Sequence, residues 1–367
     1  MSAFFSGALS VLIMVLILSV LITIHEFGHY IMARLCGIRV REFAIGMGPA
    51  FYKRQKRDED GNPVGTAFSL RVFPIGGYCD MGEDEESDDP AHFRNKKNRK
   101  KFLVLVSGAV MNFLIGIVLF IVMYMMLIGN YQNIPTIDRL DPAFPYADKI
   151  QAGDRIVEIN GNAIFSYMDL SLFIDRGAGE PYTFVVERDG QRHTVRNVEP
   201  LLGDEDNPKF GFTPGIEEIT LPVAIREGFV SSIDSVRIVW ISLGDLFSGR
   251  AGVTDMMGPV GMGDVVNDIV TSPGTDENPI DFADRFGAIL NLAGLIAVNL
   301  AVVNLLPIPA LDGGRIVFLF ISWVLVKVRK KPLSSKLEGY IHGGTMLLLF
   351  GLMIFIFFND IRRIIGL

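Results

Sequence analysis

Four long apolar stretches constrain this chain more than any other feature of its sequence. Each approaches or exceeds the roughly 20 residues that a helix needs to cross the hydrocarbon core of a bilayer. The stretches are residues 3–24, 102–128, 286–311 and 341–358. Half of the 367 residues are hydrophobic and the mean hydropathy is +0.37, which is unusually apolar for a soluble protein of this length. The sequence therefore predicts a polytopic α-helical membrane protein with about four transmembrane helices.

Composition excludes several classes of protein. A formal net charge of −7 gives no indication of nucleic-acid binding. Two cysteines, Cys36 and Cys79, are too few for a disulfide framework. The first apolar stretch lacks the basic start and the small-residue cleavage site of a signal peptide, so we expect a retained helix.

Lysine and arginine predict the orientation, because short cytoplasmic loops of membrane proteins are enriched in both. These residues are dense in 34–101 and again in 327–336, which we therefore expect on the cytoplasmic side. This assignment places the N-terminus, residues 130–285 and the C-terminus on the outer side.

The connecting segments indicate two folded regions. Residues 37–82 alternate like two strands around a turn rich in Gly, Asn and Pro, which predicts a β region at the cytoplasmic edge of the bilayer. Residues 133–200 predict a small αβ domain with hairpin turns at Asn160-Gly161 and Asp189-Gly190. The predicted segments are 1–36 (first transmembrane helix), 37–101 (re-entrant β region and charged loop), 102–129 (second transmembrane helix), 133–200 (αβ domain), 201–285 (linker, from 201 to 215, and amphipathic surface helix, from 222 to 248), 286–328 (broken third transmembrane segment), 329–340 (basic loop) and 341–360 (fourth transmembrane helix).

An H-E-x-x-H motif lies at the end of the first stretch, in His25-Glu26-Phe27-Gly28-His29. Two histidines four residues apart share one face of a helix and can bind one Zn²⁺ together. Glu26 lies beside that face, where it can accept a proton from an attacking water. With five histidines in the chain, a chance match to this motif is improbable.

A catalytic zinc usually has three protein ligands, so a third ligand is expected elsewhere in the chain. His92 and His193 lie in polar segments, and His342 at the start of the last span is a conceivable ligand. Asp312 is the stronger candidate because it is the only acidic residue between positions 286 and 337. A buried carboxylate at that depth needs a cation, and a zinc held by the motif histidines would be one.

The segment before Asp312 is broken by Pro307 and Pro309. Irregular backbone at membrane depth is tolerated only where it is buried in protein or lines a wet cavity. Asn304, one turn earlier, has an amide that could bind a substrate backbone or an oxyanion, with helix packing as the alternative. Arg315 is interpreted as an interfacial anchor.

In the second span, residues 107–112 (SGAVMN) combine small side chains with one amide. Small residues let helix backbones approach closely within a bilayer. We therefore predict a helix-packing role for this segment, including Asn112.

Together these motifs resemble the site-2 protease family of intramembrane zinc metalloproteases. The resemblance rests on HEFGH at 25–29, FPIGGY at 73–78, GPVG at 258–261 and NLLPIPALDGG at 304–314. The likeness is greatest to bacterial regulators of envelope stress that cleave anti-sigma factors. Residues 133–200 resemble a PDZ domain, most clearly in the stretch AGDRIVEING. The chain has room for one such domain, where well-known Gram-negative members have two.

The resemblance implies roles for individual residues. Zinc would be bound by His25, His29 and Asp312, with Glu26 as the catalytic base. The residues implied in substrate handling are Asn304, Pro307, Pro309 and, in the β region that resembles a membrane re-entrant loop, Phe73, Gly76, Gly77 and Tyr78. The β region would pair with the unwound substrate as an added strand.

The predicted function is intramembrane zinc endopeptidase activity against transmembrane helices of single-pass proteins, within regulated intramembrane proteolysis and stress response. Anti-sigma factors already cut once by an upstream site-1-type protease, or remnant signal peptides, are the expected substrates. The expected location is the bacterial inner membrane, with the N-terminus and the PDZ domain extracytoplasmic and the active site near the cytoplasmic side. No nucleic-acid partner is expected.

Two alternatives belong to other classes of protein. The first is a non-catalytic membrane scaffold that binds partners through its PDZ domain and keeps zinc for structure, which would require a fourth protein ligand such as His342. The second is a transporter, although the sequence shows no inverted repeat.

Overall fold

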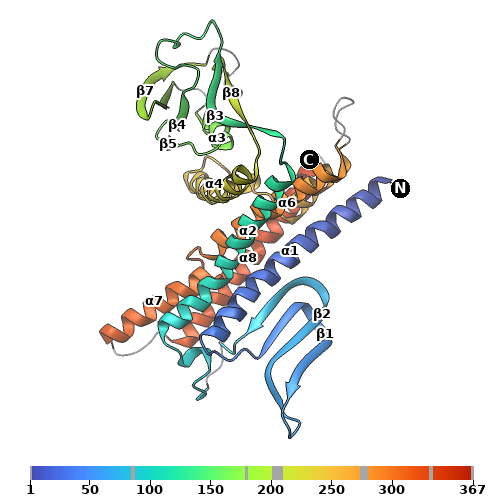
Figure 1. Cartoon of the computed structure of the whole chain (residues 1–367). Helices are drawn as coiled ribbons and strands as arrows, with labels where there is room; N and C mark the ends of the chain where they lie inside the picture. Colours follow the sequence, from blue (N-terminus) through green and yellow to red (C-terminus); the bar gives the residue numbers. More distant parts are fainter. Residues whose placement is uncertain are drawn as a thin grey trace. The chain divides into compact units, whose positions relative to one another are not determined.

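A computed structural model gives the fold, shown in Figure 1. It describes residues 2–83, 87–177, 181–200, 210–272, 280–329 and 334–364. The chain divides into two compact units, of which the first comprises residues 1–118 with 238–367 and the second residues 119–237.

The first unit consists mainly of helices. Long runs of Leu, Ile, Val, Met and Phe favour helices in a bilayer because each backbone N–H and C=O must be bonded within its own segment. The helices are α1 (Ser2–Leu35), α2 (Asn98–Met126, which continues into the second unit), α5 (Pro259–Thr271), α6 (Phe282–Asn304), α7 (Asp312–Arg329) and α8 (Ser335–Ile364). Short 3-10 turns lie at Phe93–Asn95 and Val253–Asp255.

Four of these helices are long and apolar enough to cross a membrane. They are Gly7–Leu35 of α1, Asn98–Met126, Phe282–Asn304 and Lys336–Arg363 of α8. The predicted polytopic α-helical architecture is therefore confirmed at this level. The third span ends at Asn304, and the proline-containing segment 305–311 separates it from α7.

The predicted β region between the first two spans is a long hairpin, β1 (Glu42–Arg57) and β2 (Pro63–Asp80). Figure 1 shows it beside α1. Strand β2 is bent, so Glu42 of β1 pairs with Ala67 before the bend and with Asp80 after it. The end of β2 therefore forms an edge, and residues 77–80 pair with β1 on one side only among the described strands.

A polar network stabilises the bent hairpin. Glu42 accepts hydrogen bonds from Lys53 Nζ at 2.7 Å, Ser69 Oγ at 2.6 Å and an Arg71 guanidinium nitrogen at 2.6 Å. Burial would raise the pKa of Glu42, but these hydrogen bonds outweigh it and lower the pKa to about 2. The Tyr78 hydroxyl also donates to Glu42, at 3.1 Å, which connects the network to the strand edge.

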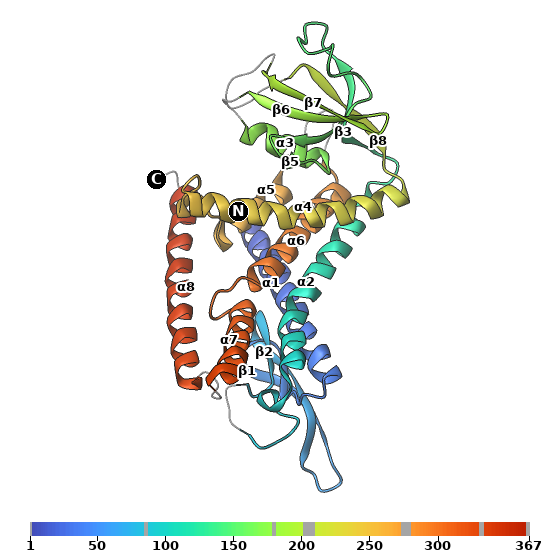
Figure 2. The ribbon, with the colours of Figure 1, turned by 90° about the vertical axis from the view of Figure 1, so that its left-hand side faces the viewer.

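The second unit contains a six-stranded sheet with the order β7-β6-β4-β3-β8 and β5 added beside β4. Its strands are β3 (Tyr131–Leu140), β4 (Arg155–Ile159), β5 (Asn162–Ala163), β6 (Tyr182–Arg188), β7 (Gln191–Val198) and β8 (Phe212–Glu218). Helix α3 (Tyr167–Arg176) contacts β3 and β4. Figure 2 shows α3 against the sheet of this unit. Both predicted hairpin turns are confirmed, with Asn160 and Asp189 in left-handed conformations before their glycines.

The sheet extends beyond the boundary predicted at residue 200. Strand β8 pairs with β3 in antiparallel register, from Tyr131↔Glu218 to Leu140↔Phe212. The predicted linker at 201–215 is thus wrong from residue 212 onward, while residues 201–209 lie outside the described part of the chain. Without β8, one side of β3 would expose unpaired backbone groups, which explains why the strand is part of the sheet.

The predicted amphipathic helix is present as α4 (Leu221–Ser248). Two of its charged residues, Asp234 and Arg237, bond to other residues of the second unit. Arg237 donates to Asp169 of α3 at 2.6 Å and to Asp234 one turn away at 3.3 Å. Asp234 also accepts a 2.7 Å bond from Ser166 Oγ, at the N-cap of α3. These contacts, all within the second unit, hold α4 against α3.

Asp234 makes the stability of the second unit depend on pH. Burial, reinforced by the nearby Asp169 carboxylate, raises the pKa of Asp234 to about 6, despite hydrogen bonding from Ser166 and attraction to Arg237. A raised carboxyl pKa means that the folded state holds the proton more tightly than the unfolded chain. The resulting penalty is full above about pH 6 and disappears as the pH falls toward the unfolded value near 4.

Asp234→Asn is expected to remove this dependence. Between pH 7 and pH 5, the melting temperature of the wild type should rise relative to that of the variant, measured on the full chain in detergent. Asp148→Asn, which changes an exposed carboxylate of the same unit, is the control and should behave like the wild type. Parallel curves for the wild type and Asp234→Asn would contradict the assignment.

Candidate active site

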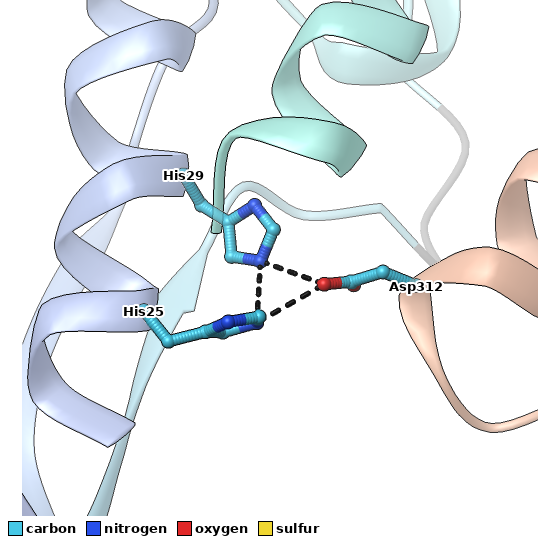
Figure 3. Close-up of side chains that lie close together, drawn as sticks. All are labelled: His25, His29 and Asp312. Atoms are coloured by element: carbon cyan, nitrogen blue, oxygen red, sulfur yellow. Dashed lines mark hydrogen bonds and ion pairs between the residues drawn. The ribbon is translucent and has the colours of Figure 1, made fainter. Parts of the chain in front are cut away.

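The two motif histidines lie one turn apart near the C-terminal end of α1. His25 is 8% exposed and His29 is 6% exposed. Their Nε2 atoms are 3.1 Å apart, and Figure 3 shows both rings directed toward the same point. The i, i+4 spacing on a continuous helix produces this pairing without help from the rest of the fold.

Asp312 completes a group of three from a distant part of the chain (Figure 3). Its Oδ2 lies 3.0 Å from His25 Nε2 and 3.1 Å from His29 Nε2. Asp312 is the first residue of α7, and the positive end of the helix dipole favours a carboxylate there.

The proline-containing segment before α7 brings Asp312 to this place. Gly313 and Gly314 let the segment pack closely, since a Cβ at either position would lie 2.2–2.3 Å from backbone oxygens of Leu306 or Ile308. His342 of α8 accepts a 2.8 Å hydrogen bond from the backbone N–H of Ala310, whose φ is +83°. Helix α8 thus fixes the strained residue two positions before Asp312.

The three side chains fit a zinc ion. Their donor atoms are 3.0–3.1 Å apart, so all can lie at the ~2.0–2.2 Å distances that zinc makes to nitrogen and oxygen. His29 Nδ1 lies 2.7 Å from the Val104 carbonyl, which leaves Nε2 free for metal, as is usual for zinc histidines. Among the His, Cys, Asp and Glu side chains of the described residues, His25, His29 and Asp312 form a group close enough to bind one ion.

The other histidines lie outside this group. His342 bonds to Ala310 and packs against the Phe318 ring, with the ring centroids 5.1 Å apart. His92 is buried in the loop after β2, where its Nδ1 accepts the Arg94 N–H, and His193 is exposed on β7. The structure thus places His342 as a support for the Asp312 segment.

Helix α2 packs against the histidines through Gly108. A Cβ at this position would lie 2.5 Å from His29 Nε2 and 2.7 Å from His25 Nε2. The close helix packing predicted for residues 107–112 is seen at Gly108, where α2 lies directly against the two histidines of α1.

Gly108→Ala is therefore expected to displace the ring nitrogens and lower bound zinc by about tenfold or more, in the range found for disrupted metal surroundings. Zinc per chain, measured by atomic emission after dialysis, tests this. Gly287→Ala is the matched control, because a Cβ there meets nothing within 4 Å. Full zinc content in Gly108→Ala would show that the site tolerates the methyl group.

Glu26 lies beside the metal ligands and faces the end of β2. Its Oε2 accepts a 3.0 Å hydrogen bond from the backbone N–H of Cys79. The bond holds the carboxylate at the strand edge, next to the histidines.

A cleft of about 670 Å³ opens on these residues. Its lining includes the residues of the motif, the end of β2 and parts of α2, α6 and α7. Tyr78 and Asn304 line it, and the Asn304 amide nitrogen is 3.5 Å from His25 Nδ1. Phe73, Gly76, Gly77, Pro307 and Pro309 are not among its lining residues.

Those five residues lie outside the lining, in the β hairpin and in the segment before α7. Phe73 is 57% exposed at the bend of β2, close to Gly48 of β1. Gly76 has a φ of +77°, and Gly77 packs closely on the Ala44 carbonyl oxygen. The two prolines lie in the 305–311 segment that positions Asp312.

Comparison with known proteins identifies the family. The profile of Peptidase family M50 matches residues 13–352. The chain belongs to peptidase family M50. This is the family of the site-2 proteases, so the resemblance found in the sequence is confirmed.

Relatives of this M50 peptidase match along most of its length. A protein of Clostridium acetobutylicum named as a zinc metalloprotease is 31% identical over 358 residues, covering 96% of this chain and 97% of the relative. The zinc metalloprotease RasP of Geobacillus kaustophilus is 27% identical, with 96% and 98% covered. The metalloprotease MmpA of Caulobacter vibrioides is 29% identical, with 95% and 94% covered. The M50 peptidase described here is a zinc metalloprotease.

Three features of the M50 site were not predicted from sequence. Arg315 pairs with Glu83 at the cleft and is thus more than an interfacial anchor. The backbone N–H of Cys79 donates a hydrogen bond to Glu26, and no pattern of side chains predicts a backbone contact of this kind. Asn112, for which helix packing is predicted, is among the residues that line the cleft. An amide in an otherwise uncharged span was the available signal for Asn112, because polar groups at membrane depth are costly.

Proposed function

We propose that this M50 peptidase cleaves single transmembrane helices within the membrane. The observation that carries the proposal is the place of the metal-ligand group. Two ligands lie in a membrane-spanning helix, and the third begins α7 just beyond another such helix. A half-buried strand edge ends beside them, at Tyr78 and Cys79.

In this proposal His25, His29 and Asp312 hold the zinc. When bound, zinc supplies a Lewis acid that polarises a carbonyl and makes water a stronger nucleophile near neutral pH. Glu26 accepts the proton of the attacking water and donates it to the departing amine. The Cys79 N–H keeps the Glu26 carboxylate directed toward the cleft before reaction.

The strand edge is proposed to hold the substrate. A peptide bond within a helix has its carbonyl bonded inside that helix, so the segment must unwind before water reaches the carbon. Residues 77–80 offer a one-sided strand on which an extended segment can pair. Tyr78 and Cys79 lie in the cleft lining, next to the proposed base.

The substrates are proposed to be single-pass proteins already shortened outside by another protease, such as anti-sigma factors, or remnant signal peptides. The sheet of the second unit is proposed to be a PDZ domain that screens them. The proposed location is the bacterial inner membrane. Basic residues in 34–101 and 327–336 favour a cytoplasmic side for these segments, and so for the site. RasP and the Enterococcus faecalis protease Eep are relatives whose names describe proteases.

A non-catalytic zinc scaffold is less well supported. A closed structural site needs four protein ligands. In the part of the chain that the structure describes, the group has three, and His342 is bonded to the Ala310 backbone instead.

Purified enzyme in detergent with a synthetic single-span peptide tests the proposal. We expect one main cut inside the apolar segment, located by mass spectrometry and abolished by 1,10-phenanthroline. Cuts confined to polar flanks, or cleavage unchanged by the chelator, would contradict it.

A further inference from the structure

Asn112 stands out among the residues that line the cleft. It lies on α2 four residues after Gly108, on the same face that packs against His25 and His29. Its side chain is fully buried, at 0% exposure. Within the described residues, neither its Oδ1 nor its Nδ2 has a hydrogen-bond partner.

An unpaired amide in such a place requires an explanation. Buried polar side chains are nearly always hydrogen-bonded, because burial removes their water without replacing it. The lining of the same cleft includes apolar side chains such as Ile22, Leu105 and Leu300. Leucine has nearly the shape of asparagine and would pack among these side chains without the desolvation penalty of an unpaired amide. The amide therefore points to a ligand that enters the cleft.

The chemistry of an unwound peptide matches this amide. Successive residues of an extended segment direct their backbone N–H and C=O groups to opposite sides. The edge at residues 77–80 can bond the groups on one side only, and those on the other side need partners. An asparagine amide offers both a donor and an acceptor, as a peptide group does. Asn304, the other amide in the cleft lining, already lies 3.5 Å from His25.

We propose that Asn112 is a substrate-binding residue whose amide hydrogen-bonds the backbone N–H and C=O of one residue of the unwound segment. This inference rests on the proposed cleavage within a transmembrane segment. It reassigns a residue whose sequence context predicts helix packing to recognition of the substrate backbone. Because backbone groups are common to all sequences, the contact would favour an extended conformation over any particular side chain.

Asn112→Leu should separate function from structure. We expect kcat/KM for the single-span peptide to fall about 10- to 100-fold, as for two lost hydrogen bonds and poorer alignment. Zinc content should be unchanged, and the melting temperature should be equal or higher, because a buried unpaired amide is removed. Asn299→Leu, which changes an exposed amide on α6, is the matched control and should retain wild-type kcat/KM.

Peptides with one backbone amide replaced by an ester identify the contact directly. An ester lacks the N–H and has a weaker carbonyl acceptor. For the wild type, one position near the cut should lower kcat/KM about two- to tenfold, the effect of one hydrogen bond. In Asn112→Leu, the ester at that position should cause no further loss.

Two results would overturn the inference. One is Asn112→Leu cleaving as well as the wild type while the wild type cuts within the apolar segment. The other has two parts: the melting temperature of Asn112→Leu falls below that of the wild type, and every ester lowers kcat/KM by the same factor in the variant as in the wild type. That result would indicate that the Asn112 amide has a structural role. A wild type that does not cut within the segment would instead refute the proposed function itself.

Discussion

Glu26→Gln is expected to reduce peptide cleavage by about 100- to 10,000-fold, the range that general acid–base catalysis contributes. Glutamine keeps the size of the side chain and can still accept the Cys79 N–H bond, which is 3.0 Å in the wild type. It cannot take up a proton from the attacking water. Loss of activity with this variant thus isolates proton transfer from the geometry of the site.

Single-turnover cleavage with excess enzyme measures the effect without a contribution from product release. Zinc content should stay at the wild-type level, because Glu26 is not among the three clustered ligands. Glu59→Gln, in the exposed turn of the β hairpin, is the control for a lost carboxylate and should cleave normally. Wild-type rates in Glu26→Gln would exclude Glu26 as the base.

The parts of this site that could be predicted are those determined over short distances in sequence. Helical periodicity alone places His25 and His29 on one face. Two prolines mark a break before Asp312, two glycines follow it, and an isolated carboxylate there needs a cation. These arguments concern local backbone preference and the cost of charge, neither of which requires knowledge of the tertiary fold.

The parts that could not be predicted depend on distant pairing or on the rotation of a helix. Strand β8 joins β3 from about 80 positions away in sequence, and neither strand carries a signal for its partner. Helix α2 is apolar all round, so its periodicity does not indicate which side faces the site. The sequence therefore does not predict that Asn112 is on the side of α2 that faces the site.

Asp312→Ala is expected to lower zinc affinity about a hundredfold or more. Loss of supporting contacts around a zinc site costs 10- to 100-fold, and loss of a direct ligand should exceed that. The remaining pair, His25 and His29, would hold the ion by two nitrogens only. Bound zinc should fall well below one per chain after dialysis against a weak chelator, and cleavage should fall with it.

Asp80→Ala is the matched control for zinc binding, because Asp80 is a second carboxylate in the cleft lining that lies outside the ligand group. Its Oδ1 accepts the Gly82 N–H at 2.8 Å, so it has a separate structural partner. Undiminished zinc in Asp312→Ala would mean that another group supplies the third ligand. His342→Ala, made both in the wild type and in Asp312→Ala, would then show whether His342 is a ligand or a support. If His342 is a ligand, its removal should lower bound zinc in both backgrounds. If His342 only supports Ala310, its removal should lower bound zinc in the wild type but not in Asp312→Ala.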